Sequence, residues 1–501
     1  MKSIFKLSIL SFLFLLVSCS KKEDEINTTI EDEFVVSVED EINFFIWKGL
    51  NLYYLWQKDV ADLDDDKFKV SENTINLTEL YTHFRQYNSP EETFENLLNR
   101  PTDRFSIIVD DYIELENSFQ GLNLSSGMEF GLVRYRDTPS NIFGYVRYVV
   151  PNSSSATNNV TRGQIFNSVD GMQMTENNAF ALLFGSNTNF TIGLADYNDG
   201  NPTTNGQTIS LTKTELQENP VAVAKVITEG TQKIGYLMYN QFASNFDAQL
   251  NAVFADFKAE NIDHLIVDLR YNPGGFVSSA TYLAGMITGQ FNGELFSQNI
   301  WNSKVMEALT ADNFTNNFRT EIRNTDANGN VVLQENLNSL GLTKVYFITS
   351  NASASASELV INSLSAYIDV RVIGATTTGK QEGSITLYDS QNFSKTGANL
   401  KQNHRYAMQP IVFEISNKDG VNYRDGIVPD SEAFPGVFLS EDFGNLGVLG
   451  ERSDPLLNET LNYINTGAKS VQKSNKEIDF KEIFNSKLAY PAKDNMIVDL
   501  K

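Results

Sequence analysis

Four short, continuous apolar runs in the second half of the chain constrain its fold more than any other feature. These runs are residues 234–239, 265–269, 345–349 and 370–373. Several of them end in a glycine- or serine-rich turn that a plausible helix follows. A strand that is buried on both faces has this pattern, because neither of its faces has to meet water. The runs therefore predict an α/β layer in which helices cover a mostly parallel sheet.

The N-terminal part of the chain has a helical period instead. Between residues 36 and 63, large apolar side chains recur at three- or four-residue steps, at Ile42, Ile46, Leu50, Tyr53 and Trp56. Side chains at this spacing lie on one face of a helix, and that face has to be buried. We expect a helical domain over residues 36–112, and we interpret the aromatic stripe as core packing and not as a ligand site.

The middle of the chain has short alternating apolar runs, such as residues 142–150 and 165–169, between clusters of Asn, Gly and Ser. Such a pattern is typical of strands and turns, with one helix-like piece at residues 176–184. Because 501 residues exceed what one core can hold, we expect several domains. The predicted division has a β-rich domain over 113–217, an α/β core over 218–435 and a C-terminal extension over 436–501.

Net charge and motif content exclude several classes of function. The formal charge of −24 disfavours nucleic acid, which is itself a polyanion. The three histidines, His83, His264 and His404, have no carboxylate or cysteine at metal-ligand spacing. No phosphate loop or dinucleotide fingerprint is present either. We therefore expect a protein that needs no metal and no cofactor.

The N-terminus carries Lys2 and Lys6 and then an apolar run, residues 9–17, that suits a signal peptide but is too short to span a bilayer. The run ends in Leu16-Val17-Ser18-Cys19, and Cys19 is the only cysteine, so no internal disulfide can form. This sequence resembles the bacterial lipobox. The resemblance implies a signal peptide over 1–18 and a lipidated Cys19 on a flexible tether over 19–35. We therefore expect an exported protein that is anchored by lipid in the bacterial cell envelope. The expected membrane is the outer membrane, with the protein on either its periplasmic or its surface face. The alternative is an inert thiol in an ordinary signal.

Three segments carry the chemistry. The first, residues 351–358, places small side chains between a predicted strand and a predicted helix, where backbone amides and the helix N-terminus can stabilise an oxyanion. The second is Gly379-Lys380, which follows another predicted strand; a desolvated, neutral lysine can deprotonate a serine. The third is the turn at residues 272–275, whose paired glycines leave an amide exposed.

Together these segments closely resemble the S41 family of C-terminal processing peptidases, in which the nucleophile is the first serine of Ser-Ala-Ser-Glu and the base lysine lies 25 residues later. Here Ser355 and Lys380 have that spacing. The resemblance implies a Ser355 nucleophile, a Lys380 general base and an oxyanion hole formed by the amides of Ala356 and of Gly274 or Gly275. It also implies a crotonase-like (ClpP-like) α/β catalytic core and protein or peptide substrates.

Residues 148–153, 162–165 and 169–171 resemble the PDZ modules of processing proteases, although Gln164 stands where those modules usually have Asp. A PDZ module binds an extended peptide, commonly by its free C-terminus, along a sheet edge. A multidomain α/β and α+β protein is therefore expected, with a helical N-terminal domain, a PDZ-like domain and the catalytic core. The alternative for the middle domain is a small β-rich spacer.

One departure from the family pattern affects the lysine. Many members place a glutamine four residues after the lysine, where it orients the amine, whereas this chain has Ser384. Ser384 is thus a candidate third member. Glu382 is a poorer one, because a nearby carboxylate raises the pKa of lysine. Glu358 is expected to cap the helix or support the fold.

Three functions are carried forward. The first is a serine endopeptidase with a Ser/Lys dyad and PDZ-assisted recognition of substrate C-termini. The second is a catalytically inactive peptide-binding lipoprotein on the same fold, which Ser384 and the altered PDZ motif motivate. The third, a cell-surface glycan-binding protein, depends only on the lipid anchor and the abundant aromatic residues. A Ser/His triad is a weaker choice than the Ser/Lys dyad.

Overall fold

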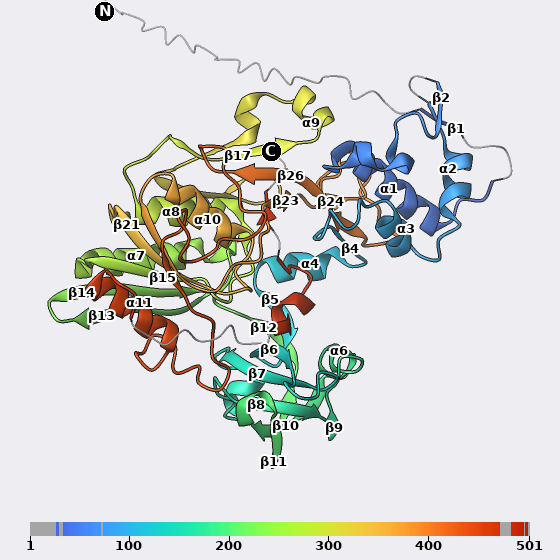
Figure 1. The fold of residues 1–501 in the computed structure, drawn as a ribbon. Coiled ribbons are helices and arrows are strands. Elements are labelled where there is room, and N and C mark those ends of the chain that lie inside the picture. The colour runs from blue at the N-terminus through green and yellow to red at the C-terminus, as the bar shows by residue number, and fades with distance from the viewer. Residues whose placement is uncertain (1–26, 30–33, 72–73, 471–481, 495, 499–501) are drawn as a thin grey trace, which may run out of the picture.

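The computed structural model describes residues 27–29, 34–71, 74–470, 482–494 and 496–498. The expected signal peptide and Cys19 lie outside the described residues. Figure 1 shows an α/β core, a helical region beside it and a β-rich domain set apart from both. None of the helices in the described part of the chain combines the length and the apolar character that crossing a membrane requires.

The helical region begins with α1 (Val38–Tyr53), which starts at Ser37 in a capping box with Asp40. Ile42, Ile46 and Leu50 are buried on its inner face, so the predicted core stripe is confirmed there. The other elements of the region are β1 (Asn27–Thr29), η1 (Gln57–Asp59), η2 (Ala61–Leu63), β2 (Lys69–Ser71), β3 (Thr74–Asn76), α2 (Leu77–Phe84), α3 (Pro90–Asn96), β4 (Ile107–Val109) and α4 (Tyr112–Phe119).

The helical region and the α/β core share one hydrophobic cluster. Phe45 of α1 packs on Phe393 of the core, with 6.2 Å between the ring centroids. The side-chain amide of Asn302 donates to the carbonyl oxygens of Leu52 and Tyr54, both at 3.0 Å. The helical region therefore packs against the core.

The β-rich domain has a hydrophobic cluster of its own. Its sheet has the order β11-β10-β8-β7-β6-β28, in which β28 comes from the C-terminal part of the chain. The predicted strands over 142–150 and 165–169 and the predicted helix over 176–184 are confirmed, with small shifts at their ends. The elements are β5 (Leu122–Ser125), β6 (Met128–Arg134), β7 (Ile142–Val149), α5 (Ser154–Thr157), β8 (Ile165–Val169), β9 (Met172–Gln173), α6 (Ala179–Phe184), β10 (Asn189–Asp196), η3 (Asn198–Gly200), β11 (Thr203–Thr212) and β12 (Thr214–Gln217).

The α/β core is built on a six-stranded sheet of order β13-β14-β15-β21-β22-β27. The strands from β14 to β27 are parallel, and β13 is antiparallel to β14. The four apolar runs are confirmed as strands of this sheet. Its strands and connecting helices are β13 (Val221–Glu229), β14 (Gln232–Tyr239), η4 (Ser244–Phe246), α7 (Asp247–Glu260), β15 (His264–Asp268), α8 (Val277–Ile287), β21 (Lys344–Thr349), α10 (Ala356–Ser365), β22 (Asp369–Gly374) and β27 (Gly436–Phe438).

Helices cover both faces of this sheet, which explains why its strands have no polar side. On one face Val267 and Phe347 pack in the cluster that contains α7, α8 and α10. On the other face Ile266 and Ile348 pack with Leu457 of α11 (Pro455–Thr466). Alternate residues of a strand point to opposite faces, so each run must be apolar throughout.

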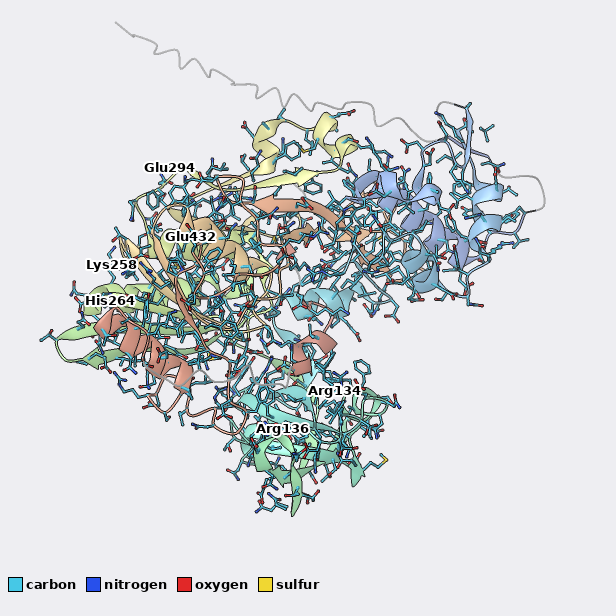
Figure 2. All side chains as sticks on the ribbon, in the orientation of Figure 1. Arg134, Arg136, Lys258, His264, Glu294 and Glu432 are labelled. Carbon is cyan, nitrogen blue, oxygen red and sulfur yellow. The ribbon has the colours of Figure 1, made fainter. Side chains whose placement is uncertain are left out.

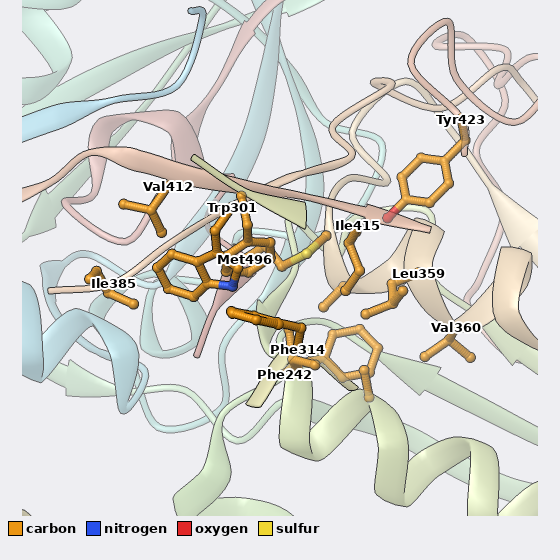
Figure 3. Packing of buried hydrophobic residues seen from close by; sticks show 14 of the residues in the cluster. Phe242, Trp301, Phe314, Leu359, Val360, Ile385, Val412, Ile415, Tyr423 and Met496 are labelled. Atoms are coloured by element: carbon orange, nitrogen blue, oxygen red, sulfur yellow. The ribbon is translucent and has the colours of Figure 1, made fainter. Parts of the chain in front are cut away.

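A second six-stranded sheet, of order β16-β29-β23-β26-β17-β18, lies beside the first. Figure 3 shows Met496 of β29 packed among core side chains that include Trp301 and Ile415. The remaining elements are β16 (Gly275–Phe276), β17 (Leu295–Trp301), α9 (Ser303–Ala308), η5 (Ala311–Phe314), β18 (Thr315–Asn317), β19 (Glu321–Thr325), β20 (Val331–Asn336), β23 (Glu382–Ser384), β24 (Leu387–Tyr388), β25 (Ala407–Gln409), β26 (Ile411–Ser416), β28 (Glu482–Asn485), η6 (Ser486–Ala489) and β29 (Met496–Ile497).

The described parts of the expected C-terminal extension over 436–501 belong to both sheets of the core and to the sheet of the β-rich domain. The boundary at residue 435 falls beside β27, which pairs with β22 and so belongs to the core sheet. Helix α11 covers one face of that sheet, β28 joins the β-rich domain and β29 joins the second sheet. These pieces are short and lack a long apolar run, so the sequence does not reveal where they pair.

Candidate active site

Ser355 lies in the turn between β21 and α10, directly before the first residue of the helix. The turn was predicted between a strand and a helix, and both elements are present. The backbone of Ser355 has φ 63° and ψ −117°, and the residue is completely buried. A non-glycine residue with a positive φ is strained, and surrounding structure must hold it in place.

Glu358, in the first turn of α10, supplies part of that support. Its Oε2 atom accepts the backbone N–H of Ser355 at 2.8 Å and that of Lys380 at 2.9 Å. Its Oε1 atom accepts the N–H of Gly379 at 2.6 Å and the hydroxyl of Thr377. The expected capping and supporting role of Glu358 is confirmed. One buried carboxylate thus fixes the main chain of both the candidate nucleophile and the candidate base.

Lys380 follows β22 in a turn that needs glycine before it. Gly379 has φ 77°, and a Cβ there would lie 2.3 Å from the carbonyl oxygen of Arg424. The side chain of Lys380 is completely buried. Burial lowers the pKa of its amine to about 8, while Asp494, Glu382 and other carboxylates act in the opposite direction. A substantial fraction of this amine is therefore neutral near physiological pH.

The amine of Lys380 contacts a segment that the sequence did not associate with it. Its Nζ atom donates to the backbone carbonyl of Asp494, close to the C-terminus, and lies 4.6 Å from the centroid of the Phe105 ring. The hydroxyl of Ser355 has no hydrogen-bond partner within the described residues. In this conformation the amine is thus engaged by Asp494, and it makes no hydrogen bond with Ser355.

The glycine turn predicted to form part of an oxyanion hole precedes β16. A Cβ on Gly275, whose φ is 134°, would lie 2.1 Å from the carbonyl oxygen of Phe242. The N–H of Gly274 donates to Oδ1 of Asn272 at 2.9 Å, which favours Gly275 over Gly274 as an oxyanion donor. Ala356 is the first residue of α10, so its N–H has no acceptor within the helix.

Asn272 connects this turn to the serine turn. Its side-chain amide donates to the backbone carbonyl oxygen of Tyr239 at 2.9 Å. Its backbone carbonyl oxygen accepts the N–H of Ala354 and the hydroxyl of Ser357, both at 3.1 Å. The two amides expected to bind an oxyanion are therefore held in one hydrogen-bonded unit. Sequence reasoning assigned no role to Asn272 beyond its place in the turn.

Ser384 lies in β23, and its hydroxyl has no hydrogen-bond partner in the described part of the chain. The bond to Lys380 that would make it a third member is absent from this conformation, and the assignment stays a prediction. Glu382 is buried in the same strand, and its proximity raises the pKa of Lys380, as expected for a poor orienting group.

The three histidines make their contacts elsewhere in the fold. Nε2 of His83 is 2.9 Å from Asp62, and Nε2 of His404 is 3.0 Å from Asp389. His264 opens β15 at the outer end of the sheet (Figure 2). The described residues contain no cluster of three or more His, Cys, Asp or Glu side chains that could hold a metal ion.

A buried charge network stands behind the glycine turn and was missed by sequence reasoning. Arg270 is completely buried and pairs with Asp268 at 2.7 Å and with Asp454, the N-cap residue of α11, at 2.9 Å. Glu441 lies 3.3 Å from Arg270 and 3.1 Å from Arg162 of the β-rich domain. The strand end that precedes the glycine turn is thus tied to the C-terminal helix and to the β-rich domain.

The arrangement has the parts that acyl transfer needs. Ser355 offers a strained, buried hydroxyl, Lys380 offers an amine with a lowered pKa, and Ala356 and Gly275 offer amides from two different turns. Glu358 and Asn272 hold the main chain of these turns. Amides fixed in this way stabilise a developing oxyanion without reorganisation.

Two family models match the chain. The model described as "Peptidase family S41" matches residues 233–433, which include Ser355 and Lys380. The model described as "Peptidase S41 N-terminal domain" matches residues 41–107, most of the helical region. The two matches lie on either side of the β-rich domain.

Curated relatives and solved structures agree with these matches. A probable CtpA-like serine protease of Staphylococcus epidermidis is 25% identical over 166 residues, which are 33% of this chain and 29% of the relative. A carboxyl-terminal-processing protease of Picosynechococcus is 28% identical over 78 residues, 16% of this chain and 19% of the relative. The chain therefore spans less than a third of the length of either relative.

A solved structure from Bacteroides fragilis that carries the name S41 protease covers 88% of this chain and 100% of its own, with a TM-score of 0.61 and 20% identity. At that identity the likeness concerns the fold alone. The chain has the mixed α/β fold of that protein, including the N-terminal helical region.

Proposed function

Because the chain belongs to peptidase family S41, we propose that it is a serine endopeptidase in which Ser355 is the nucleophile and Lys380 is the general base. One observation carries the proposal. Lys380 is fully buried, its pKa is lowered to about 8, and the carboxylate that holds its main chain also holds that of Ser355. A neutral amine placed beside a serine is the activating partner that a Ser/Lys dyad requires.

The reaction follows from these groups. Neutral Lys380 takes the proton of the Ser355 hydroxyl as Oγ bonds to the carbonyl carbon of the scissile peptide bond. The N–H groups of Ala356 and Gly275 stabilise the oxyanion. As the intermediate collapses, the C–N bond breaks and Lys380 gives its proton to the leaving amine. Water, deprotonated by Lys380, then attacks the acyl-enzyme, and Ser355 regains its proton as the acid product leaves.

The substrates are proteins or peptides, and we propose that the β-rich domain is PDZ-like and recognises their C-termini. The mode of strand pairing at the domain supports this: β28 adds antiparallel to the edge strand β6, which is how a PDZ module takes a peptide. Gln164, where PDZ modules usually have Asp, accepts the N–H of Thr161 at 3.0 Å. An Asp at this position could accept a hydrogen bond in the same way.

The proposed location is the bacterial cell envelope, with Cys19 lipidated and the domains held outside the cytoplasm. This part of the proposal depends on Leu16-Val17-Ser18-Cys19 and the preceding apolar run. Palmitate labelling of the full chain, beside Cys19→Ala, tests it: label on the parent and none on the variant is expected, and equal labelling would contradict it.

The activity is tested with residues 20–501 as parent protein and the variants Ser355→Ala and Lys380→Ala. Cleavage of casein by the parent and loss in both variants is expected. Activity that survives in Ser355→Ala would contradict the assignment. A fluorophosphonate probe should label the parent at Ser355 and leave Ser355→Ala unlabelled.

The second candidate function, a peptide-binding lipoprotein without turnover, is favoured by one observation. The amine of Lys380 is bound by the carbonyl of Asp494, and Ser355 and Ser384 have hydroxyls without partners among the described residues. Tight peptide binding together with no probe labelling in any variant would select this function over the peptidase.

A further inference from the structure

The C-terminal segment, defined as residues 482–494 and 496–498, contacts both proposed peptide-binding sites, the edge of the β-rich domain and the catalytic turns. Its first strand, β28, lies on the edge of the β-rich domain, and its last strand, β29, lies beside the catalytic turns. In Figure 1 its short helix η6, drawn in red, lies near β5 and β12, between the domain and the core.

The contacts of β28 are those of a peptide bound by strand addition. Phe484 pairs with Leu132 of β6 and packs against Phe180 and Phe184 of α6, with ring centroids 6.0 and 5.6 Å away. The segment thus occupies the space between an edge strand and a helix. Backbone pairing and one inserted side chain are the means by which a sheet edge takes an extended peptide.

Charge holds this end of the segment in place. The carboxylate of Glu482 is 2.5 Å from the guanidinium of Arg147 and also accepts the hydroxyl of Tyr145. Both partners of the ion pair are almost completely buried, so the pair is desolvated and each side chain has a fixed orientation. The ion pair favours one register of β28 on β6.

The middle of the segment crosses from the domain to the core. The hydroxyl of Ser486 donates to Glu129 at 2.5 Å, and the amine of Lys487 donates to the carbonyl oxygen of Asn240 at 2.9 Å. Further along, the N–H of Ala492 donates to the hydroxyl of Ser118 at 3.2 Å. This path leads to the turn that carries Lys380.

At the catalytic end the segment fills a slot between β16 and β23. Met496 pairs in parallel with Gly275, the proposed oxyanion donor, and Ile497 pairs with Ser384 of β23. The N–H of Val498 donates to the carbonyl oxygen of Ser384 at 3.3 Å. Lys380, two residues before β23, donates to the carbonyl of Asp494.

We propose that the C-terminal segment is an intramolecular peptide ligand that occupies both peptide-binding grooves and competes there with extended peptide substrates. The inference rests on the proposed function, because it takes the slot between β16 and β23 as the place of the substrate. While the segment is bound, the amine of Lys380 donates to Asp494 and makes no hydrogen bond with the hydroxyl of Ser355. A substrate strand cannot enter the occupied slot. Departure of the segment frees the amine and the slot together.

The ligand class follows from the same contacts. The slot accepts a chain that runs parallel to β16 and β23, with an apolar side chain at the position of Met496, which is completely buried. The β-rich domain accepts an aromatic side chain at the position of Phe484. Each groove therefore favours an extended peptide with a bulky apolar residue, aromatic at the β-rich domain and aliphatic in the slot.

Binding of a labelled peptide tests the proposal without any hydrolysis. The probe is a fluorescein-labelled peptide of residues 482–498, and the protein is residues 20–501 with Ser355→Ala. The test variant adds Phe484→Ala and Val498→Pro, which remove the aromatic contact and the N–H bonded to Ser384. A tethered ligand acts at an effective concentration of about a millimolar. The variant should bind the probe at least about tenfold more tightly than its parent.

The matched control is Lys493→Ala, an exposed position within the same segment, and it should bind the probe as weakly as the parent. Equal affinity of the test variant and the parent would overturn the proposal.

Hydrogen exchange of the unaltered chain gives a second measurement that needs no folded variant. A saturating amount of the same peptide without label should raise the exchange rate of amides in residues 492–498 by about tenfold or more, with no change in β21. Unchanged exchange in residues 492–498 would mean that the segment is a permanent part of the fold, and the proposal would fail.

These readouts separate the inference from the proposed function. Absence of hydrolysis and of fluorophosphonate labelling in every form would contradict the peptidase assignment, and the peptide-binding results would still stand. Conversely, a peptidase whose C-terminal segment cannot be displaced would keep its activity assignment and lose only this inference.

Discussion

The Oε2 atom of Glu358 accepts the backbone N–H of Lys380 at 2.9 Å, so the helix that follows Ser355 fixes the turn that carries Lys380. The same oxygen accepts the N–H of Ser355 at 2.8 Å. The strained backbone of Ser355 is therefore stabilised by a carboxylate that the lysine turn encloses. The main chain of both members of the proposed dyad therefore depends on the same side chain.

Glu358→Gln tests this dependence. An amide has only one acceptor oxygen, so its NH₂ group would face two donors that now have an acceptor. Each buried donor left unpaired costs about 1–3 kcal/mol. We expect a loss of that size or larger in the free energy of unfolding, measured by urea denaturation, together with reduced casein cleavage. The control Glu432→Gln, at an exposed position (Figure 2), should change stability by about 0.5 kcal/mol or less.

The pH dependence of activity should report the amine of Lys380. In the proposed mechanism the neutral amine is the active form. Its pKa is about 8, so kcat/KM for a peptide should rise as pH increases through about 8. Glu382 raises that pKa by its charge. Glu382→Gln should therefore shift the rising limb to lower pH. A shift to higher pH, or none, would contradict the assignment of the limb to Lys380.

Burial of Lys380 should reduce stability, and the pH dependence of the loss follows from its pKa. The folded-state pKa, about 8, lies below the ordinary value of 10.5. Below pH 8 the amine is protonated in both the folded and the unfolded state, so the full cost of burying its charge is present. Above pH 10.5 the amine is neutral in both states, and this cost is gone. A difference of about 2.5 units corresponds to about 3 kcal/mol. Lys380→Met should raise the free energy of unfolding by up to that amount at pH 7.

The gain from Lys380→Met should disappear between pH 8 and 10.5. Urea denaturation of parent and variant at pH 7 and pH 10.5 measures it. A gain that is equal at both values would mean that the charge of the amine is not its cause.

The sequence predicted the parts of the site that adjacent residues build. Ser355 and Lys380 each follow a buried strand, and their spacing matched a known family, so their turns could be placed correctly. The apolar runs of the sheet could be recognised because both faces are covered. Local pattern was enough for these features.

Long-range contacts could not be predicted in the same way. The pairing of Met496 with Gly275 joins residues 221 positions apart in the sequence, and a two-residue strand has no period to detect. The roles of Asn272 and Glu358 as multiple hydrogen-bond partners depend on which donors the fold brings to them. The sequence therefore indicated only a C-terminal extension, although this segment contacts Lys380.

Gly275→Ala tests the close approach at the glycine turn and the proposed role of Gly275 as an oxyanion donor. The added Cβ would lie 2.1 Å from the carbonyl oxygen of Phe242, and φ is 134°, so the turn would have to move. The matched control is Gly293→Ala, whose φ is 81° and whose Cβ would meet no atom within 4 Å. The control should lose about 1–2 kcal/mol, the usual cost of a left-handed backbone. Gly275→Ala should lose more, and its cleavage rate should fall by about 100-fold.

Unfolding free energy and cleavage rate, measured for both glycine variants, separate a local effect from a general one. If Gly275→Ala lost no more stability than Gly293→Ala and kept its rate, Gly275 would not be an oxyanion donor.

The buried charge network should make Arg270 one of the most sensitive positions outside the dyad. Arg270 lies between Asp268 and Asp454 and is completely buried, so Arg270→Met would leave Asp268 without its counterion and Asp454 with only Arg162, at 3.9 Å. Removing one partner of a buried ion pair costs about 3–5 kcal/mol, and we expect a loss of that size in the free energy of unfolding, measured by urea denaturation.

An exposed pair on the β-rich domain, Arg134 with Glu176, provides the control (Figure 2). Arg134→Met should cost about 1 kcal/mol or less. Because Arg270 lies two residues before the glycine turn, its loss should also reduce cleavage more than the control does. Equal costs for the two variants would show that the network does not hold the turn.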